Sequence, residues 1–283
     1  MNTEDEPLEI DLFHARYTFS DRARIEKQIL DIYGKHAGRQ GRILVATQVV
    51  EQSLDLDFDL LVSQIAPIEF LMQRMGRLWR HDRINTELSP RSTRIKQPTF
   101  ITLLPDQPIS SWKTHYQGSG FVYRNIRVLY RTNQYLNKNS KLTFPDCYRD
   151  AIEYVHNEQA YTEEPEELLS LFESYQQEQD GSAYTAKMYS VLDSKPLNDV
   201  DPRCALLTRE GEMTATVVLL NEQGELWHGG DYQEQQDREL STVAIAKKHA
   251  KGKQDPDLYC VKAIVNHDIN YSELGVFLPL KNE

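Results

Sequence analysis

The sequence predicts an α/β fold with a mostly parallel sheet, followed by a helical linker and a small β-rich C-terminal domain. Three observations lead to this class. Short apolar runs alternate with amphipathic segments early in the chain, helical patterns dominate its middle, and closely spaced extended runs with turn signals fill its last part. We expect the chain to divide into residues 1–106, 107–198 and 199–283.

The first part of the chain is predicted to run strand, helix, strand, strand, helix, strand. Strands are expected in four short apolar runs, at 10–14, 43–46, 60–62 and 99–104. The second of these is apolar on both faces, as strands covered on both sides of a parallel sheet are. A helix is expected to begin at Ser20 and Asp21, which suit a helix N-terminus, and to end at Gly34. Its buried stripe comprises Ile25, Ile29, Ile32 and Tyr33.

The second helix carries the most informative stretch of the chain. Pro67 opens this helix, at a position where proline is tolerated. At about 100° per residue, Gln73, Arg77 and Arg80 fall on one face. The opposite face is apolar and comprises Ile68, Leu71, Met72, Met75 and Leu78. Guanidinium groups keep their charge and make forked hydrogen bonds to phosphate oxygens, so this helix is predicted to present positive charge to a polyphosphate.

The charge distribution favours this interpretation over a solvated helix face, which is the ordinary explanation for arginines on an amphipathic helix. The whole chain is acidic, with 32 Lys+Arg against 43 Asp+Glu and a net charge of −11. Residues 74–96 nevertheless hold six arginines and one lysine against two acids, a net of +5. A basic island in an acidic protein is a local electrostatic device.

A second polar segment, residues 47–59, directly follows a predicted strand. It is therefore expected at the carboxyl end of that strand, where open α/β sheets bind ligands. The carboxylate of Asp55 can accept hydrogen bonds from ribose hydroxyls. The hydroxyls of Thr47 and Ser53 can donate to phosphates of a nucleic-acid backbone. Two other carboxylates, those of Asp57 and Asp59, are expected only to solubilise the loop.

The overall composition is that of a globular protein in a reducing compartment. Hydrophobic residues make up 40% and charged residues 27% of the chain. No apolar run is long enough to span a membrane, and the acidic N-terminus is unlike a secretion signal. Cys147, Cys204 and Cys260 are far apart and odd in number, which argues against a disulfide framework or a zinc site. We expect a cytoplasmic protein with no membrane partner.

The remainder of the chain is expected to be helical and then β-rich. Helical segments are predicted around 126–136 and 146–158. Residues 163–180 contain seven acids and no base, which indicates a solvated helix face or a linker without chemistry. Strands are predicted at 205–208, 216–220, 226–228, 259–265 and 275–280.

Two segments resemble the fifth and sixth motifs of superfamily 2 helicases. They are residues 45–55, Val-Ala-Thr-Gln-Val-Val-Glu-Gln-Ser-Leu-Asp, and residues 73–80, Gln-Arg-Met-Gly-Arg-Leu-Trp-Arg. More narrowly, the sequences of these two segments are similar to those of the CRISPR-associated helicase–nucleases of type I interference systems. Residues 12–22 resemble the fourth motif of that family. Segments that resemble the linker and C-terminal domain of its subtype E members are 123–132, 144–146 and 207–213. The resemblance covers nearly the whole chain and is looser after about residue 225.

The resemblance implies a catalytic role shared with another domain. Residues 1–106 would form the later part of the second RecA-like motor domain, with ATP and Mg²⁺ held between it and a first motor domain. Arg77 and Arg80 would reach the γ-phosphate, with Arg80 as the arginine finger and Gln73 orienting the same site. Asp55 would touch the ribose of the nucleotide.

The same resemblance implies a path for single-stranded DNA. Thr47, His14 and Arg16 would lie near the DNA backbone, together with Ser53, and the β-rich domain would close the DNA channel. Expected partners are single-stranded DNA, the N-terminal nuclease and first motor part of the same protein, and a CRISPR surveillance complex.

The chain departs from the complete family pattern. It has no Gly-x-x-x-x-Gly-Lys-[Ser/Thr] loop and no Asp-Glu box, so it lacks the usual ligands for the phosphates and for magnesium. Its His-Asp pairs, His81-Asp82 and His267-Asp268, are isolated, so no nuclease metal site is expected. We expect a C-terminal half that has little or no ATPase activity by itself.

Two other interpretations stay open. The chain could be a non-catalytic scaffold that docks to a CRISPR surveillance complex, because the catalytic half is missing while the β-rich part is intact. It could also belong to another superfamily 2 motor, such as an RNA helicase, which would need contacts to 2′-hydroxyls.

Overall fold

The computed structural model describes residues 9–38, 41–51, 54–83, 86–91, 93–106, 109–159, 161, 164–191 and 214–277. These residues form two compact units that interleave along the chain. One unit comprises residues 1–56, 85–90 and 212–283, and the other comprises residues 57–84 and 91–211. The expected division into residues 1–106, 107–198 and 199–283 stays a prediction.

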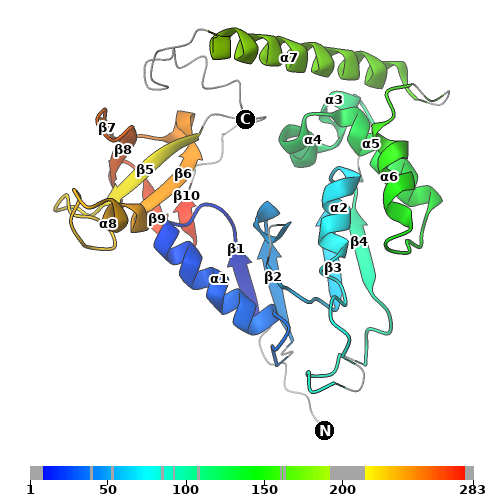
Figure 1. Cartoon of the computed structure of the whole chain (residues 1–283), viewed down its shortest axis with the longest axis horizontal. Coiled ribbons are helices and arrows are strands. Elements are labelled where there is room, and N and C mark those ends of the chain that lie inside the picture. The colour runs from blue at the N-terminus through cyan, green and yellow to red at the C-terminus, as the bar shows by residue number, and fades with distance from the viewer. Residues whose placement is uncertain are drawn as a thin grey trace. The chain divides into compact units, whose positions relative to one another are not determined.

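The first unit begins with a β-α-β motif. Strand β1 (Glu9–Phe13) pairs in parallel with β2 (Arg42–Ala46), and helix α1 (Phe19–Tyr33) connects them, as Figure 1 shows. Helix α1 begins after Thr18, whose hydroxyl accepts a hydrogen bond from the N–H of Asp21, and ends at Gly34 as expected. The hydroxyl of Tyr33 donates to Asp11 at 2.7 Å, which ties the helix to one face of the strands. A short 3₁₀ helix, Gln48–Glu51, follows β2.

The second unit begins with a similar arrangement. Strand β3 (Leu60–Gln64) pairs in parallel with β4 (Thr99–Leu103), and helix α2 (Ile68–Met75) lies between them in sequence. Helix α2 follows Pro67, as the sequence predicts, and buries Ile68, Leu71 and Met72. The parallel pairs and their helices confirm the α/β class.

Both parallel pairs expose apolar side chains on one face. On the first pair, Ile10 is 63% exposed and Val45 is 50% exposed. On the second pair, Val62 and Leu103 are both 52% exposed. The expectation that the strand at 43–46 is buried on both faces is therefore wrong for this chain, because α1 covers only one side of a two-stranded sheet.

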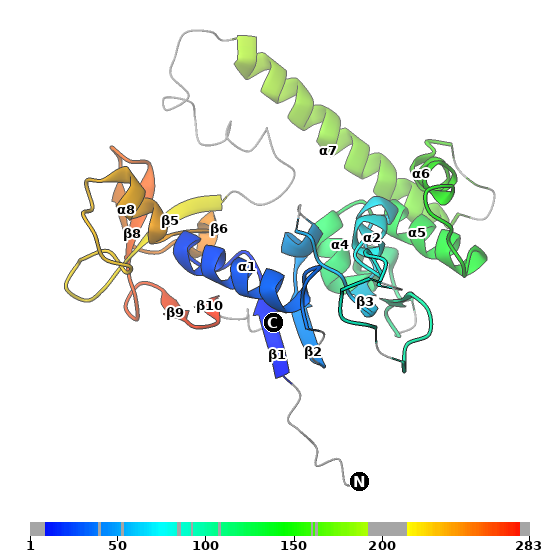
Figure 2. The same cartoon turned by 60° about the horizontal axis from the view of Figure 1, so that its bottom comes forward.

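Beyond β4, the described residues of the second unit are mainly helical, and α7 is the longest of these helices (Figure 2). Its helices are α3 (Trp112–His115), α4 (Gln117–Tyr123), α5 (Ile126–Lys138), α6 (Cys147–His156) and α7 (Glu166–Val191). Helix α5 contacts both α6 and α7 and buries residues along most of its length. None of the helices among the described residues is both long and apolar enough to cross a membrane.

A buried ion cluster links α5 to the segment before α7. Arg127 and Arg131 both donate to the carboxylate of Glu164, at 2.9 and 2.5 Å, and all three side chains are at most 3% exposed. Arg131 also donates to the carbonyl oxygens of Val155 and Asn157. The expectation that residues 163–180 only solvate a surface is therefore wrong at Glu164.

The β-rich part of the first unit is a four-stranded sheet with a hairpin packed against it. The sheet order is β6-β5-β8-β7. The strands are β5 (Thr214–Leu220), β6 (Thr242–Ala246), β7 (Lys253–Asp255), β8 (Cys260–Ile264), β9 (Asn270–Ser272) and β10 (Gly275–Phe277). Strands β9 and β10 form the hairpin. Helix α8 (Gln235–Leu240) and a 3₁₀ turn, Lys247–His249, flank β6.

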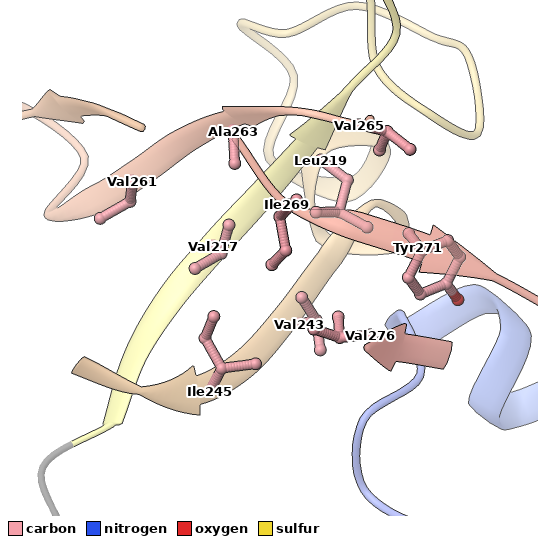
Figure 3. Packing of buried hydrophobic residues seen from close by; sticks show 10 residues of the cluster. All are labelled: Val217, Leu219, Val243, Ile245, Val261, Ala263, Val265, Ile269, Tyr271 and Val276. Atoms are coloured by element: carbon pink, nitrogen blue, oxygen red, sulfur yellow. The ribbon is translucent and has the colours of Figure 1, made fainter. Parts of the chain in front are cut away.

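One face of this sheet forms the core of the domain. Val217 and Leu219 of β5 are fully buried between Val243, Ile269 and Val276, as Figure 3 shows. The sequence predicts β5, β8 and β10 close to their positions in the structure. It does not predict β6, β7 or β9. The strand expected at 205–208 lies outside the described residues.

Candidate functional site

The arginine-bearing segment is not one continuous helix. Helix α2 ends at Met75, and Gly76 caps it. Gln73 is therefore helical, whereas Arg77 and Arg80 lie in the turn beyond it. The expectation that these three side chains share one helix face is wrong.

The backbone after α2 is held by bonds to a segment before β3. The N–H of Phe58 donates to the carbonyl of Arg77 at 2.8 Å, and the N–H of Trp79 donates to the carbonyl of Phe58 at 3.0 Å. Trp79 adopts a positive φ of 47°, which is rare for a bulky residue. These strand-like hydrogen bonds take the place of the helical hydrogen bonds that would continue α2, so the chain leaves the helix here.

A single buried carboxylate fixes this turn. One Oδ atom of Asp57 accepts the backbone N–H of Arg80 at 3.0 Å. Arg83 donates its Nε to the other Oδ atom at 2.7 Å, and Arg91 donates to both, at 2.9 and 3.1 Å. The Asp57 side chain is fully buried. Asp59 is half-buried and accepts from Arg91 at 3.2 Å.

The carboxylates of Asp57 and Asp59 are therefore structural, and the expectation that they only solubilise a loop is wrong. The alternation Leu-Asp-Leu-Asp-Phe-Asp carries no signal for this role, because alternating acids usually point to solvent. The signal lies in the pair of arginines more than twenty residues downstream, which cannot be matched to Asp57 without the fold.

These contacts also show that some arginines of the basic segment, residues 74–96, bind groups within the protein. The guanidinium groups of Arg83 and Arg91 neutralise Asp57 and Asp59. Arg74 donates to the hydroxyls of Ser63, at 2.6 Å, and Tyr123, at 2.8 Å. Part of the excess positive charge is thus used for internal structure.

The three predicted phosphate-site residues differ in exposure. Gln73 on α2 and Arg80 in the turn are exposed, whereas Arg77 is 8% exposed. The side chain of Arg80 makes a long bond of 3.4 Å to the carbonyl of Gly76. The backbone of Arg80 is thus held by Asp57, while the residue as a whole is exposed to solvent.

Residues predicted to lie near nucleic acid gather at one edge of the β1–β2 pair. The loop that contains His14 and Arg16 follows β1, and Thr47 follows β2. Parallel strands bring their carboxyl ends to the same edge, and the N–H of Thr47 donates to the carbonyl of Phe13 at 3.2 Å. Arg16 and Thr47 are exposed there. The fourth predicted residue, Ser53, lies outside the described residues.

His14 is occupied by contacts within the protein. Its Nε2 lies 3.1 Å from the carbonyl oxygen of Leu274, and its Nδ1 accepts the backbone N–H of Arg16 at 3.1 Å. Its ring stacks on Tyr17, with centroids 4.5 Å apart. Burial and the charge of Arg16 lower the pKa of His14 despite its bond to Leu274, so the neutral ring is favoured near neutral pH. The geometry suits a residue that shapes the loop.

Asp55 lies at the other end of α1. It is exposed and lines a hollow of about 330 Å³ with the residues that follow the helix, including Lys35 and His36. Helix α1 has 15 residues and is therefore about 22 Å long. The predicted nucleotide contact and the predicted DNA contacts of this unit are thus separated by the length of one helix.

The described residues do not include a cluster of three or more histidine, cysteine or acidic side chains that could hold a metal ion. His267 and Asp268 contact each other at 3.0 Å on the surface. Asp57, which is placed close to the arginine turn, is engaged by two guanidinium groups, so it is a poor magnesium ligand.

Comparison with known proteins identifies relatives of this chain. The family model described as "CRISPR-associated nuclease/helicase Cas3, C-terminal" matches residues 1–83. The CRISPR-associated endonuclease/helicase Cas3 of Escherichia coli is 36% identical over 215 residues, which are 75% of this chain and 23% of the relative. The protein of the same name from Thermus thermophilus is 32% identical over 237 residues, or 76% of this chain and 25% of the relative.

The fold agrees with a solved structure of the same group. T. fusca Cas3-AMPPNP has a TM-score of 0.74 and 20% sequence identity, and the match covers 97% of this chain and 36% of that one. The chain thus spans about a quarter of the length of the curated relatives it matches. Together, these matches show that the chain belongs to the Cas3 family of CRISPR-associated helicase–nucleases, as a C-terminal region of that family.

Proposed function

We propose that this chain supplies an arginine finger and part of the DNA path to an ATP-driven helicase of CRISPR interference. The remaining parts of the motor and the nuclease would come from the region that Cas3 relatives possess and this chain does not span. Single-stranded DNA and a CRISPR surveillance complex are the partners of the assembled protein in this proposal.

The turn around Arg80 is the observation that carries the proposal. A finger must keep its charge and meet the γ-phosphate at a fixed point. The bond from the N–H of Arg80 to buried Asp57 fixes the backbone, and Arg80 is an exposed residue on the surface of its unit. We assign the finger to Arg80 and a supporting role to Arg77, whose burial suits a positioning residue better than a mobile contact.

ATP fits the side chains of this chain only in part. In one unit, Arg80 and Gln73 suit a terminal phosphate. In the other unit, Asp55, beside its hollow, suits a ribose hydroxyl. The described part of the chain does not offer a carboxylate set for Mg²⁺, so the metal ligands would come from the first motor domain. The AMPPNP named with the T. fusca relative supports nucleotide binding by the assembled protein.

The proposed DNA path follows the edge where β1 and β2 end. Arg16 and Thr47 are exposed there and can contact phosphates without reading bases, which suits a motor that moves along any sequence. His14 contributes by holding the loop.

The test is reconstitution. The chain would be mixed with a polypeptide that carries the nuclease and first motor domain of a Cas3 relative, and phosphate release would be measured with and without single-stranded DNA. We expect DNA-stimulated hydrolysis only in the mixture. Arg80→Ala should lower turnover on the order of 10³-fold, because the charge that builds on the transferred phosphoryl group loses its partner.

Arg94→Ala is the matched control, since Arg94 is an exposed arginine of the same basic island outside the proposed site. It should retain turnover within about twofold, which general screening of a surface charge allows. Full turnover in Arg80→Ala, or an equal loss in both variants, would remove the finger role.

A further inference from the structure

The loop that leads from β1 into α1 is attached to the β-rich domain by a partly buried cluster of four side chains. Thr18 and Asp21 come from the start of α1, and His228 and Tyr271 come from the β-rich part, more than 200 positions away in sequence. All four belong to the same compact unit. Figure 3 shows the hydroxyl of Tyr271 next to the ribbon of α1.

The hydroxyl of Tyr271 is the centre of this cluster. It donates to Oδ2 of Asp21 at 2.5 Å and accepts the backbone N–H of Thr18 at 3.1 Å. Burial first, and then the carboxylate of Asp21, raise the pKa of Tyr271 to about 12, so the hydroxyl keeps the proton that it donates. Tyr271 thus fixes both the backbone and the first acidic side chain of α1.

His228 completes the cluster. Its Nε2 lies 2.8 Å from Oγ1 of Thr18 and 3.5 Å from Oδ2 of Asp21. Its own backbone N–H donates to the hydroxyl of Ser241, which is fully buried between α8 and β6. The histidine is therefore anchored in the β-rich domain and engages the N-cap of α1.

The hairpin β9–β10 is also hydrogen-bonded to the same loop, through other residues. The N–H of Val276 donates to the carbonyl of Arg16 at 2.8 Å, and Leu274 bonds to His14. Gly275 has a φ of +80°, and a Cβ atom there would lie 2.6 Å from the carbonyl oxygen of Arg16. Only glycine permits this approach between the two backbones.

The described contacts that shape the loop therefore come largely from the β-rich domain. From these contacts we infer that Tyr271 and His228 are positioning residues, which hold the loop of His14–Thr18 so that Arg16 stands beside Thr47 on the proposed DNA path. The inference rests on the proposed function, because it assigns a purpose to the position of Arg16. The β-rich domain thereby sets the geometry of a motor loop.

The test uses Tyr271→Phe in the full chain, with Tyr33→Phe as the matched control. Both substitutions remove a tyrosine-to-aspartate hydrogen bond at α1, but the bond of Tyr33 to Asp11 does not involve the β-rich domain. The first measurement is amide hydrogen exchange without DNA. We expect the amides of Thr18 and Val276 to exchange at least about tenfold faster in Tyr271→Phe, as the loss of a bond to a charged group implies, and to be unchanged in Tyr33→Phe.

The second measurement is the affinity of the reconstituted mixture for a fluorescein-labelled oligo(dT). We expect Tyr271→Phe to weaken binding roughly tenfold, within the same range of bond energies, and Tyr33→Phe to leave it unchanged. His228→Gln keeps an amide that can contact Thr18 and should bind the oligonucleotide better than His228→Ala. This rescue separates positioning from loss of fold.

Each result decides something. Unchanged exchange at Thr18 and Val276 in Tyr271→Phe would overturn the inference, whatever the DNA result. Faster exchange with unchanged affinity would show that the cluster holds the loop but that the loop is off the DNA path, which overturns the positioning role and that part of the proposed function. Failure of the unmodified mixture to bind oligo(dT) would overturn the proposed DNA path and with it the purpose assigned to Arg16. The exchange experiment contains no DNA and would still show whether the cluster holds the loop.

Discussion

Asp57 is a carboxylate that joins two guanidinium groups and a backbone N–H in the interior of its unit. Replacing it with asparagine keeps the size of the side chain but removes the charge that balances Arg83 and Arg91. We expect Asp57→Asn to lower the free energy of unfolding by about 3–5 kcal/mol, the usual cost of breaking a buried pair. Urea unfolding followed by circular dichroism measures this change.

Asp82→Asn serves as the control for Asp57→Asn, because Asp82 is an exposed acid in the same segment. It should change the free energy of unfolding by less than about 0.5 kcal/mol. Equal effects of the two substitutions would mean that the buried cluster contributes no more than a surface charge.

Glu164 predicts a pH dependence. Burial alone would raise its pKa, but the hydrogen bonds from Arg131 and Arg127 outweigh burial and lower the pKa to about 2. The unfolded value is about 4.3. Since the folded pKa is the lower one, the stabilisation by Glu164 is complete above the unfolded pKa and is lost as the pH falls from about 5 towards 2.

The measurement is the urea midpoint of the wild type and of Glu164→Gln at a series of pH values. The gap between the two proteins should be constant at neutral pH and shrink below about pH 4.3. Glu153→Gln is the control, because the pair of Glu153 with Arg149 is exposed on α6 and should contribute little at any pH. A gap that does not change with pH would contradict the assigned ionisation of Glu164.

At this scale the sequence predicts residue types better than residue roles. Motif wording identifies Arg80, Thr47 and Arg16, and all three lie exposed in the structure. Local charge patterns predict that Asp57 and Glu164 are solvated acids, because their guanidinium partners lie about thirty residues away and such patterns cannot identify distant pairs.

Among the elements, strand β10 depends on a glycine. Gly275 and Gly224 have nearly the same φ, +80° and +81°, but only Gly275 is crowded, by the backbone of Arg16. Gly224→Ala should cost about 1 kcal/mol for the positive φ alone. Gly275→Ala should cost about 1–3 kcal/mol more, because its new methyl group meets a backbone oxygen.

Thermal or urea unfolding of the two glycine variants tests this comparison. Because the two glycines have nearly the same φ, the cost of placing alanine at that φ cancels in the difference between the two variants. Equal destabilisation would mean that the hairpin does not approach the loop of Arg16 as closely as the structure has it.

The existence of an element is easier to predict than its ends. Helix α1, helix α5 and most strands follow from apolar periodicity and caps such as Gly34. The pattern predicts that α2 extends to Arg80, because its periodicity continues past Met75. A local pattern cannot show that the backbone of Phe58 forms strand-like hydrogen bonds with Arg77 and Trp79, and these bonds end the helix.

For the whole molecule, the two compact units predict independent energetics. Tyr271 lies in one unit and Glu164 in the other, and they share no partners among the described contacts. The costs of Tyr271→Phe and Glu164→Gln should therefore add within about 0.5 kcal/mol in the double variant. A double-mutant cycle by urea unfolding measures the coupling, and a coupling well above that value would contradict independence.

The fold class can be predicted from the order of the apolar runs, and the family can be predicted from the sequences of two motifs. The interleaving of the units does not follow from either, because it requires the start of the chain to pack with residues beyond 212. Contacts of such long sequence separation, like that between Thr18 and Tyr271, leave no local pattern.

Helix α1 joins two places that differ in chemistry, the hollow beside Asp55 and the anchored loop of Arg16. The Gly34 end of the helix borders the hollow, and its Thr18 end is hydrogen-bonded to Tyr271 and His228. The hollow and the β-rich sheet are therefore linked through a single hydrogen-bonded element of the same compact unit.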